Sequence, residues 1–478
     1  MTEKIFDFQF SHVGNGSLPR QAGTVYVVIA KPTRVCNADC AYCSSPPLEE
    51  MGESWEPEWN LEKFKKYFDK VYPYMAEGAF WIWHGGEPML MGHNFYRQAH
   101  QYAREKMEES NKKIYFSMQS NLLSYDKKNW YDIFANDFSG SISSSFDADE
   151  LQRTMKGDAQ LYSRTFKKRM ENILNDGFRP MVIGVYTEET AHLMHKMYDW
   201  SLSLGEKAFP LRFNYCHPSG RFEEGGEIIK PITYANALID VYNRWIKDNP
   251  NFTITPLDQM FKKVVNIDGM GHCPWTRKCG GRFIEIEPNG DVYNCSEFAD
   301  IGTKYCFGSL NDDSLTIKQM LNTKPALQIK QRLLKVPASC NSCEHFNDCE
   351  GGCMRDAMLY KHGLYGKFHY CESWKRVFTR IKQSILTGEA DGILEKYDLD
   401  INSTKLALKN EIKNHFNYSE VEINEIIMNG THSPLGFGNF DYSIDFNEPQ
   451  PFDPEYEKPT IKNANKKLAN IKLVVNSN

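Results

Sequence analysis

The sequence predicts an α/β protein whose N-terminal half forms a partial (β/α)6 barrel of the TIM type. Short runs of apolar and β-branched residues alternate with longer stretches of helical pattern between residues 24 and 215. Strands separated by helices predict a parallel sheet with right-handed crossovers. Polar motifs follow several of the apolar runs, at the strand ends where barrels gather their functional groups. A cysteine-rich part follows, so we expect more than one domain.

Composition limits the class of protein. The chain has 478 residues, a length typical of two or three domains, and 25% of its residues are charged. Its net charge of −6 argues against a general nucleic-acid binder. No apolar run reaches the roughly 20 residues that span a bilayer, and the N-terminus lacks the features of a signal peptide. We therefore expect a cytoplasmic protein that binds neither nucleic acid nor membrane.

Six strands are predicted in order along the chain. The first is rich in valine, has the pattern of a strand buried on both faces, and leads directly into a cysteine loop. The others have a similar apolar character, and helical patterns separate most of them. The predicted strands span residues 24–30, 80–83, 114–120, 141–146, 181–186 and 210–215, and the predicted helices span residues 61–72, 95–111, 164–175 and 191–204.

Three cysteines, Cys36, Cys40 and Cys43, lie in the loop after the first strand. A closed structural zinc site takes four ligands, and no fourth lies nearby in the sequence. Three thiolates on a [4Fe-4S] cluster leave one iron free to bind something else, which indicates chemistry at that iron. The alternative is a group of reduced cysteines that fill a core as small hydrophobes.

The spacing C-x3-C-x2-C, with the aromatic Tyr42 before the last cysteine, resembles the signature of the radical S-adenosylmethionine (radical SAM) superfamily. This resemblance implies that the three cysteines hold a [4Fe-4S] cluster and that the methionine moiety of SAM chelates the open iron. It also places Tyr42 among the cofactor-binding residues.

Two polar strand ends resemble SAM-binding segments of this family. Gly85-Gly86-Glu87-Pro88 is similar to the GGEP turn, whose backbone groups face the SAM amino group in the family. An ordinary turn is the alternative, because glycine and proline are common in turns. Gln119 and Asn121 end a strand similar to the family's Gln-Thr-Asn segment, which faces SAM or substrate. A solvated polar cap is the alternative there.

A third segment resembles the family's Ser-Leu-Asp-Gly turn, with Ser145 and Asp147 at the matching positions. In the family the serine lies by the SAM ribose and carboxylate, and an arginine commonly follows. Here Lys156 aligns best with that arginine, and Arg153 is its rival. Lysine offers a point charge in place of a planar fork.

Nine further cysteines lie in the second region, from Cys273 to Cys371. Their spacing resembles the seven-cysteine signature of the SPASM extension, which carries auxiliary [4Fe-4S] clusters in radical SAM enzymes that act on peptides and proteins. An extra cysteine, Cys273, matches enzymes of the anaerobic sulfatase-maturing type. The resemblance implies two fully ligated clusters: cluster I with Cys273, Cys279, Cys295 and Cys353, and cluster II with Cys340, Cys343, Cys349 and Cys371. Composition alone also permits two four-thiolate zinc sites.

A β-hairpin is predicted over residues 283–293, with Asn289-Gly290 at its turn. Such a hairpin would hold Cys279 and Cys295 side by side. Cys306 matches no signature position and is predicted to be a structural thiol.

Glu297 and Cys216 are the candidate catalytic residues. In the sulfatase-maturing enzymes an aspartate base follows the cysteine that matches Cys295, but here Ser296 takes that position. This departure argues against sulfatase maturation and leaves Glu297 as a candidate base, with a surface carboxylate as the alternative. Cys216 is a candidate hydrogen-atom donor, as a cysteine is in some epimerases of the superfamily, or a buried structural thiol.

The resemblance implies a radical SAM enzyme with three [4Fe-4S] clusters and SAM, a precursor peptide or protein as substrate, and a flavodoxin- or ferredoxin-type electron donor. We expect it to form C–C (cyclophane) or thioether cross-links. Formylglycine formation in a sulfatase, peptide epimerisation, and a non-catalytic iron–sulfur scaffold or redox sensor are the alternatives. The expected parts are a lead-in (1–23), the radical SAM barrel (24–225), a helical bridge (226–272), a C-terminal SPASM iron–sulfur domain (273–386) and a C-terminal extension of unknown role (387–478).

Overall fold

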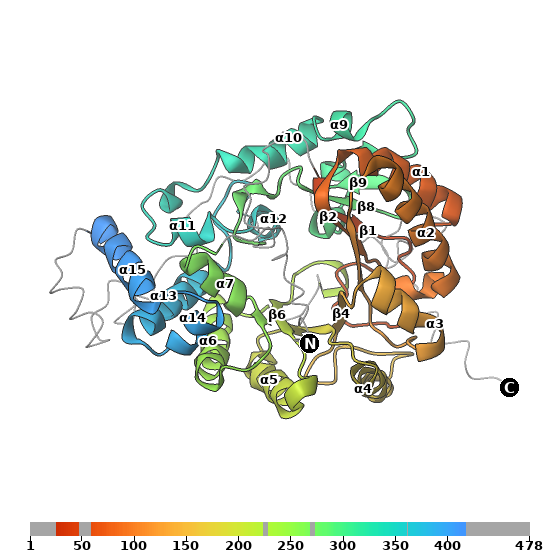
Figure 1. The fold of residues 1–478 in the computed structure, drawn as a ribbon. Helices are drawn as coiled ribbons and strands as arrows, with labels where there is room; N and C mark the ends of the chain where they lie inside the picture. The colour runs from red at the N-terminus through yellow and green to blue at the C-terminus, as the bar shows by residue number, and fades with distance from the viewer. Residues whose placement is uncertain (1–24, 47–58, 223–227, 268–272, 361, 417–478) are drawn as a thin grey trace, which may run out of the picture.

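A ten-stranded sheet lies at the centre of the computed structural model, which describes residues 25–46, 59–222, 228–267, 273–360 and 362–416. The strand order is β10-β9-β8-β1-β2-β3-β4-β5-β6-β7, and neighbours from β8 through β7 are parallel. Helices lie outside the curved sheet (Figure 1). This arrangement confirms the predicted partial barrel. No helix of the described residues is long and apolar enough to cross a membrane.

All six predicted barrel strands are present. They are β1 (Val25–Ala30), β2 (Met75–Trp83), β3 (Tyr115–Gln119), β4 (Ile142–Ser145), β5 (Met181–Tyr186) and β6 (Leu211–Tyr215). The helices between them are α1 (Leu61–Val71), α2 (His93–Ser110), α3 (Lys127–Asp132), α4 (Ala159–Asn175) and α5 (Met194–Ser203). Helix α4 begins five residues before its predicted start, because Asp158 caps it by accepting a hydrogen bond from the backbone of Leu161.

Aromatic side chains fill the space between the first strands and their helices. The ring of Phe64 on α1 lies 5.8 Å from Trp81 and 5.5 Å from Trp83 of β2, and all three side chains are buried. Such offset and edge contacts add to the free energy of apolar burial. The strands therefore hold fixed positions, and so do the loops at their carboxyl ends.

The sheet continues beyond the six predicted strands on both sides. After β6 come α6 (Pro231–Asp248), the short β7 (Ile254–Thr255), which pairs with β6, and α7 (Leu257–Val264). On the other side, β8 (Phe283–Ile286) and β9 (Asp291–Tyr293) form the predicted hairpin, with Gly290 at a positive φ of 87° in its turn. Strand β8 pairs in parallel with β1, so the hairpin extends the barrel sheet.

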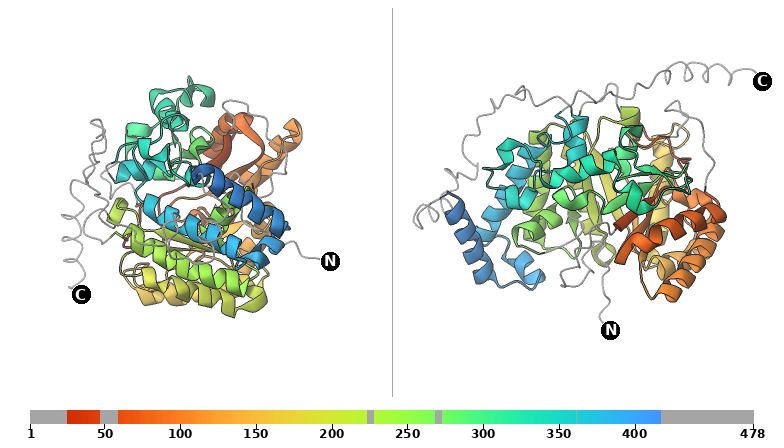
Figure 2. Two further views of the ribbon diagram at one scale, coloured as in Figure 1. Left: turned by 90° about the vertical axis from the view of Figure 1, so that its left-hand side faces the viewer. Right: turned by 90° about the horizontal axis from the view of Figure 1, so that it is seen from above.

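Short helices build the rest of the cysteine-rich part, and longer ones close it. Helix α13 packs against α6, α7 and α15, and Figure 2 shows these segments side by side. The elements are α8 (Ser296–Ala299), β10 (Gly308–Ser309), α9 (Ile317–Met320), α10 (Lys324–Lys330), α11 (Phe346–Cys349), α12 (Met354–Leu359), α13 (Cys371–Thr387), α14 (Asp391–Lys396) and α15 (Ile401–Phe416). Residues 1–24 and 417–478, which include the whole predicted lead-in and most of the predicted extension, lie outside the described residues.

A buried group of charges joins the cysteine loop to the hairpin. Lys31 is fully buried at the end of β1, and its Nζ lies 2.6 Å from Glu285 and 3.0 Å from Glu287 of the hairpin. The guanidinium of Arg34 donates two hydrogen bonds to Glu287, at 2.7 and 2.6 Å. Asp300 accepts from both cations. We call these five residues the buried ion cluster.

The pKa values of the two glutamates in the buried ion cluster are shifted in opposite directions. Burial raises the pKa of Glu285 well above its usual value, whereas Lys31 and Arg34 outweigh burial at Glu287 and lower its pKa. Burial alone would lower the pKa of Lys31, but the three neighbouring carboxyl groups raise it. The two cations therefore favour the ionised form of Glu287, whereas burial favours the protonated form of Glu285.

We expect Glu287→Ala to destabilise the protein strongly. The substitution leaves two buried cations short of a counter-charge, and breaking a buried ion pair costs about 3–5 kcal/mol. Urea unfolding at equal iron content measures the loss. The matched control is Glu109→Ala, which removes an exposed ion pair 3.3 Å long with Lys106 and is expected to cost less than about 1 kcal/mol. Equal losses in the two variants would contradict the role of the buried ion cluster.

Candidate active site

The cysteine loop is held from two sides at the carboxyl ends of the strands. Asp39 accepts hydrogen bonds from the Thr154 hydroxyl at 2.6 Å and from the backbone of Gly157 at 2.8 Å. On the other side, Arg221 donates to the carbonyl of Cys40 at 3.0 Å, and its backbone N–H donates to the carbonyl of Cys43 at 2.9 Å. The positions of all three cysteines are thus set by segments that are distant in sequence.

The Gly85-Gly86 turn lies directly against the strand end that leads to Cys36. A Cβ at Gly85 would lie 2.2 Å from the Thr33 carbonyl oxygen, and one at Gly86 would lie 2.3 Å from the Arg34 carbonyl oxygen. The N–H of Gly86 donates to Thr33 at 3.0 Å. Residues with side chains would force the two segments apart. Glycine is therefore required here for close backbone packing, as the resemblance to a cofactor cradle implies.

Glu87 is fully buried and ties the turn to the end of β3. Its carboxylate accepts from the backbone of Met89 at 2.9 Å, the hydroxyl of Ser120 at 2.7 Å and the backbone of Asn121 at 2.7 Å. Burial raises the pKa of Glu87 to about 7, although these three donors oppose the shift. Glu87 therefore acts as a positioning group for two adjacent strand ends. Pro88 begins the short 3-10 helix that follows the turn.

Gln119 and Asn121 lie at the end of β3 and link it to its neighbours. Gln119 donates to the hydroxyl of Ser145 at 3.0 Å, across to β4. The Asn121 amide donates to Asn37 at 2.6 Å and lies 3.9 Å from the sulfur of Cys36. The cysteine loop, the end of β3 and the end of β4 therefore meet in one polar network.

Asp147 fixes the cysteine loop to β5. It is buried and accepts hydrogen bonds from the backbone N–H of Val185 at 2.8 Å and from the Tyr42 hydroxyl. The guanidinium of Arg153 lies 2.9 Å from Asp147 and sits over the Tyr42 ring, 5.3 Å from its centre. Lys156, in contrast, is exposed at a left-handed turn with φ 55°. The structure thus brings Arg153, and not Lys156, to the predicted residues.

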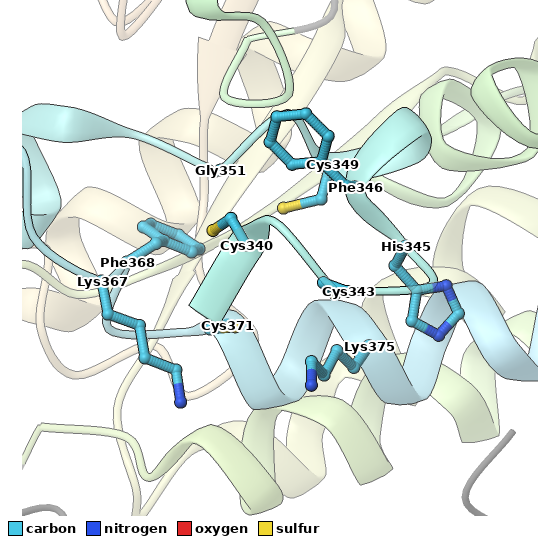
Figure 3. Close-up of a pocket in the computed structure, with 10 residues that line it drawn as sticks. All are labelled: Cys340, Cys343, His345, Phe346, Cys349, Gly351, Lys367, Phe368, Cys371 and Lys375. Atoms are coloured by element: carbon cyan, nitrogen blue, oxygen red, sulfur yellow. The ribbon is translucent and has the colours of Figure 1, made fainter. Parts of the chain in front are cut away.

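The cysteines assigned to cluster II line a hollow that is partly open to solvent. Figure 3 shows Cys340, Cys343, Cys349 and Cys371 around it. Burial raises the pKa of Cys349, and the charges of the other three thiolates raise it further. A packed core leaves few voids larger than a water molecule. Four crowded thiols around a hollow therefore fit a bound cationic group.

The cysteines assigned to cluster I also lie close enough to influence one another. Burial raises the pKa of Cys295, with added contributions from Glu297, Cys273 and Cys279. Cys353 experiences the charges of Cys273 and Cys295 in the same way. In the described residues no three His, Cys, Asp or Glu side chains converge on a point where one metal ion would bind.

A group of polar side chains lies beside the cysteines assigned to cluster I. His217 follows β6, Glu297 lies on α8, and Arg355 and Asp356 lie on α12. Glu297 lies 2.8 Å from Arg355, which also contacts Asp356 at 3.1 Å. The ring of His217 stands between the two carboxylates, 3.9 Å from Glu297 and 3.7 Å from Asp356. Arg355 and His217 together outweigh burial and hold the pKa of Glu297 at about 2. At neutral pH Glu297 is a paired carboxylate and a weak base.

Three other residues from the sequence analysis, Ser296, Cys216 and Cys306, lie among the described residues. The hydroxyl of Ser296 is buried without a hydrogen-bond partner in the described residues. Cys216 is 2% exposed at the end of β6, where burial raises the pKa of its thiol. Cys306 packs against the core around β9 and donates weakly to the carbonyl of Gly308.

Sequence reasoning missed His217, Arg355 and Asp356. One signal could have found the last two, since a charged pair directly follows Met354 within one helical turn of the ligand Cys353. His217 directly follows Cys216 at a strand end, a position that is common for functional groups in barrels.

Comparison with known proteins agrees with this geometry. The SPASM family model, described as an iron–sulfur cluster-binding domain, matches residues 273–344. The chain is 24% identical over 359 residues to the cysteine-type anaerobic sulfatase-maturating enzyme of Clostridium perfringens, which covers 72% of this chain and 92% of that enzyme.

Two solved structures share the fold. The enzyme anSMEcpe, solved with AdoMet and the Kp18Cys peptide, superposes with a TM-score of 0.64 at 22% identity and covers 76% of this chain and 99% of that one. SuiB of Streptococcus suis, solved with its precursor peptide SuiA, gives a TM-score of 0.52 at 14% identity and covers 73% and 76%. The chain therefore shares the fold of these proteins, its cysteine-rich part matches the SPASM domain, and its cysteine motifs are similar to those of radical SAM enzymes that carry this domain.

Proposed function

We propose that this enzyme is a peptide maturase that binds SAM at the cluster of Cys36, Cys40 and Cys43 and oxidises a precursor peptide or protein. One observation carries the proposal: the SAM-type cysteine loop follows β1, the hairpin between Cys279 and Cys295 pairs with β1 through β8, and the buried ion cluster joins the two. SAM bound at its cluster supplies a 5′-deoxyadenosyl radical, which takes a hydrogen atom from a carbon that acid–base groups leave intact. The peptides bound to anSMEcpe and SuiB support a peptide substrate.

The residues that would hold SAM lie at or after the carboxyl ends of four neighbouring strands, β1 to β4. We propose that the backbone of Gly85 and Gly86 contacts the amino group of SAM. We propose that Gln119, Asn121 and Ser145 contact its other polar groups. Arg153 takes the carboxylate role in place of Lys156, because its planar guanidinium is fixed by Asp147 while Lys156 points to solvent.

We expect Arg153→Met to weaken SAM binding about tenfold or more, since a hydrogen bond to a charged group contributes roughly 1.5–3 kcal/mol. Lys156→Met is expected to have a much smaller effect. Equilibrium binding of SAM to the anaerobically reconstituted protein measures both, and Arg153→Lys tests whether a point charge suffices. A larger loss of SAM affinity in Lys156→Met than in Arg153→Met would instead assign the SAM carboxylate to Lys156.

His217 is the proton acceptor that we propose. Oxidative cross-linking and formylglycine formation both remove two hydrogens from the substrate. One leaves as a hydrogen atom, and the other leaves as a proton together with an electron, for which we propose the auxiliary clusters as acceptors. Glu297 accepts protons poorly because Arg355 neutralises it. His217 is 20% exposed, has no such arginine partner among the described residues, and lies 3.9 Å from Glu297 and 3.7 Å from Asp356.

We expect His217→Asn to lower product formation at least about 100-fold, the usual size of an acid–base contribution, while 5′-deoxyadenosine still forms. The matched control is Glu297→Gln, which keeps the shape of the side chain and is expected to reduce product less. Both products are quantified by mass spectrometry in one reaction. If Glu297→Gln abolishes product and His217→Asn does not, Glu297 is the base.

The bond formed is the finer part of the proposal. Similarity to sulfatase-maturating enzymes supports formylglycine formation as a second candidate. Against it, Ser296 stands where those enzymes have their aspartate, so we favour a C–C or thioether cross-link in a ribosomal precursor peptide. We propose that a flavodoxin- or ferredoxin-type protein delivers the electron for SAM cleavage.

The intact mass of a small peptide encoded beside the gene, co-produced with the enzyme without oxygen, tests the proposal. We expect a loss of two hydrogens per site, and fragmentation then distinguishes a cross-link from an oxidised serine or cysteine. An unchanged mass with uptake of solvent deuterium indicates epimerisation, for which Cys216→Ala is the test. A protein that forms no 5′-deoxyadenosine under strong reductant would be a scaffold or sensor, and not an enzyme.

A further inference from the structure

Arg332 is a buried cation without a buried anion beside it. It lies in the 3-10 turn Gln331–Leu333 after α10 and is 0% exposed. Its Nη1 donates to the carbonyl of Gly366 at 3.1 Å and its Nη2 to that of Gly351 at 2.6 Å. Its Nε has no hydrogen-bond partner, and no carboxylate of the described residues pairs with it.

An isolated buried guanidinium is strongly destabilising, because two carbonyl dipoles replace water poorly around a full charge. Arg355 shows the usual solution in the same domain. It is equally buried, but it contacts the carboxylates of Glu297 and Asp356. Arg332 therefore needs a negative charge of another kind.

The cysteines of both auxiliary sites surround Arg332. Gly351, its acceptor, stands between Cys349 of cluster II and Cys353 of cluster I in the chain. A Cβ at Gly351 would lie 3.5 Å from Nη2 of Arg332 and 3.9 Å from the sulfur of Cys340.

The turn that carries Arg332 also adjoins cluster I. Its neighbour Lys330 packs against Gly280, next to Cys279, with 3.0 Å between the Lys330 Cα and a Cβ built on that glycine. Burial lowers the pKa of Arg332, while the charges of Cys340, Cys353, Cys349 and Cys279 oppose this shift. These four thiolates come from both sites.

We propose that Arg332 is the shared counter-cation of the two auxiliary clusters and raises the reduction potentials of both. A cube with four thiolates is anionic, and reduction adds a further negative charge. A fixed cation in a low-dielectric interior stabilises the reduced form, and the local charge is one of the factors that set cluster potentials. The inference rests on the iron–sulfur clusters of the proposed function, and it does not depend on which substrate is modified.

Lys375 offers an internal comparison. It lies one helical turn after Cys371 on α13, is half-buried, and lines the hollow of cluster II (Figure 3). Its neighbouring thiolates are Cys343 and Cys371, which both belong to cluster II. Removing its charge should therefore affect one cluster, whereas removing that of Arg332 should affect two.

The experiment is an EPR-monitored redox titration of the iron-loaded full chain, without SAM or peptide. We expect Arg332→Gln to shift the potentials of both auxiliary clusters to more negative values, and Lys375→Gln to shift cluster II alone and by less. Arg332→Lys keeps the charge and should stay near the parent protein. The cluster of Cys36, Cys40 and Cys43 serves as the unshifted reference. A cysteine variant of cluster II, Cys343→Ala, assigns the signals.

Three results would overturn the proposal. They are unchanged auxiliary potentials in Arg332→Gln, a shift in one cluster alone, and equal shifts in Arg332→Lys and Arg332→Gln. Absence of auxiliary signals in the parent protein would instead refute the clusters, and with them the proposed function.

A second measurement applies if Arg332→Gln loads iron poorly, and it compares the two proteins after all iron has been removed. The melting temperature of the iron-free parent, relative to iron-free Arg332→Gln, should be lower than that of the iron-loaded parent relative to any iron-loaded variant fraction, because the iron-free parent alone keeps a bare buried cation. An equal or higher relative melting temperature of the iron-free parent contradicts the proposal.

Discussion

The buried ion cluster is the constraint on which this structure depends. Lys31 and Arg34 stand on the strand that leads to the cysteine loop, and their carboxylate partners Glu287 and Asp300 stand on the auxiliary hairpin and beyond it. Charges removed from water must be paired, and partial pairing is strongly destabilising. The cysteine loop therefore has one compatible position relative to the auxiliary domain. These contacts join two cysteine regions that are more than 200 residues apart in sequence.

Buried carboxylates also connect the segments around the cysteine loop. Glu87 ties the glycine turn to the end of β3, and Asp147 ties Tyr42 and Arg153 to β5. Each carboxylate is shielded from solvent and satisfied by donors from different strands. A radical enzyme must hold its target carbon close to the reactive centre and exclude water. Preorganised strand ends meet this need better than mobile side chains, because their positions are fixed before the substrate binds.

Two fully buried arginines of the cysteine-rich part, Arg355 and Arg332, have different partners. Beside the cysteines assigned to cluster I, Glu297 pairs with Arg355, and the ring of His217 lies 3.9 Å from Glu297 and 3.7 Å from Asp356. Near the cysteines of both auxiliary sites, Arg332 stands without a carboxylate partner in the described residues and donates only to the carbonyls of Gly351 and Gly366. One of these two arginines is thus paired with carboxylates, and the other is not.

The sequence by itself determined the elements and the metal chemistry. Six strands, the hairpin and both cysteine groups were predictable, because apolar period, turn residues and thiol spacing are local properties of the chain. Tertiary structure alone decided that β8 lies beside β1, that Arg153 replaces Lys156 at Asp147, and that His217 meets Glu297 and Asp356. These contacts join segments far apart in sequence, and their partners are chosen by strand order and by the need to pair buried charges.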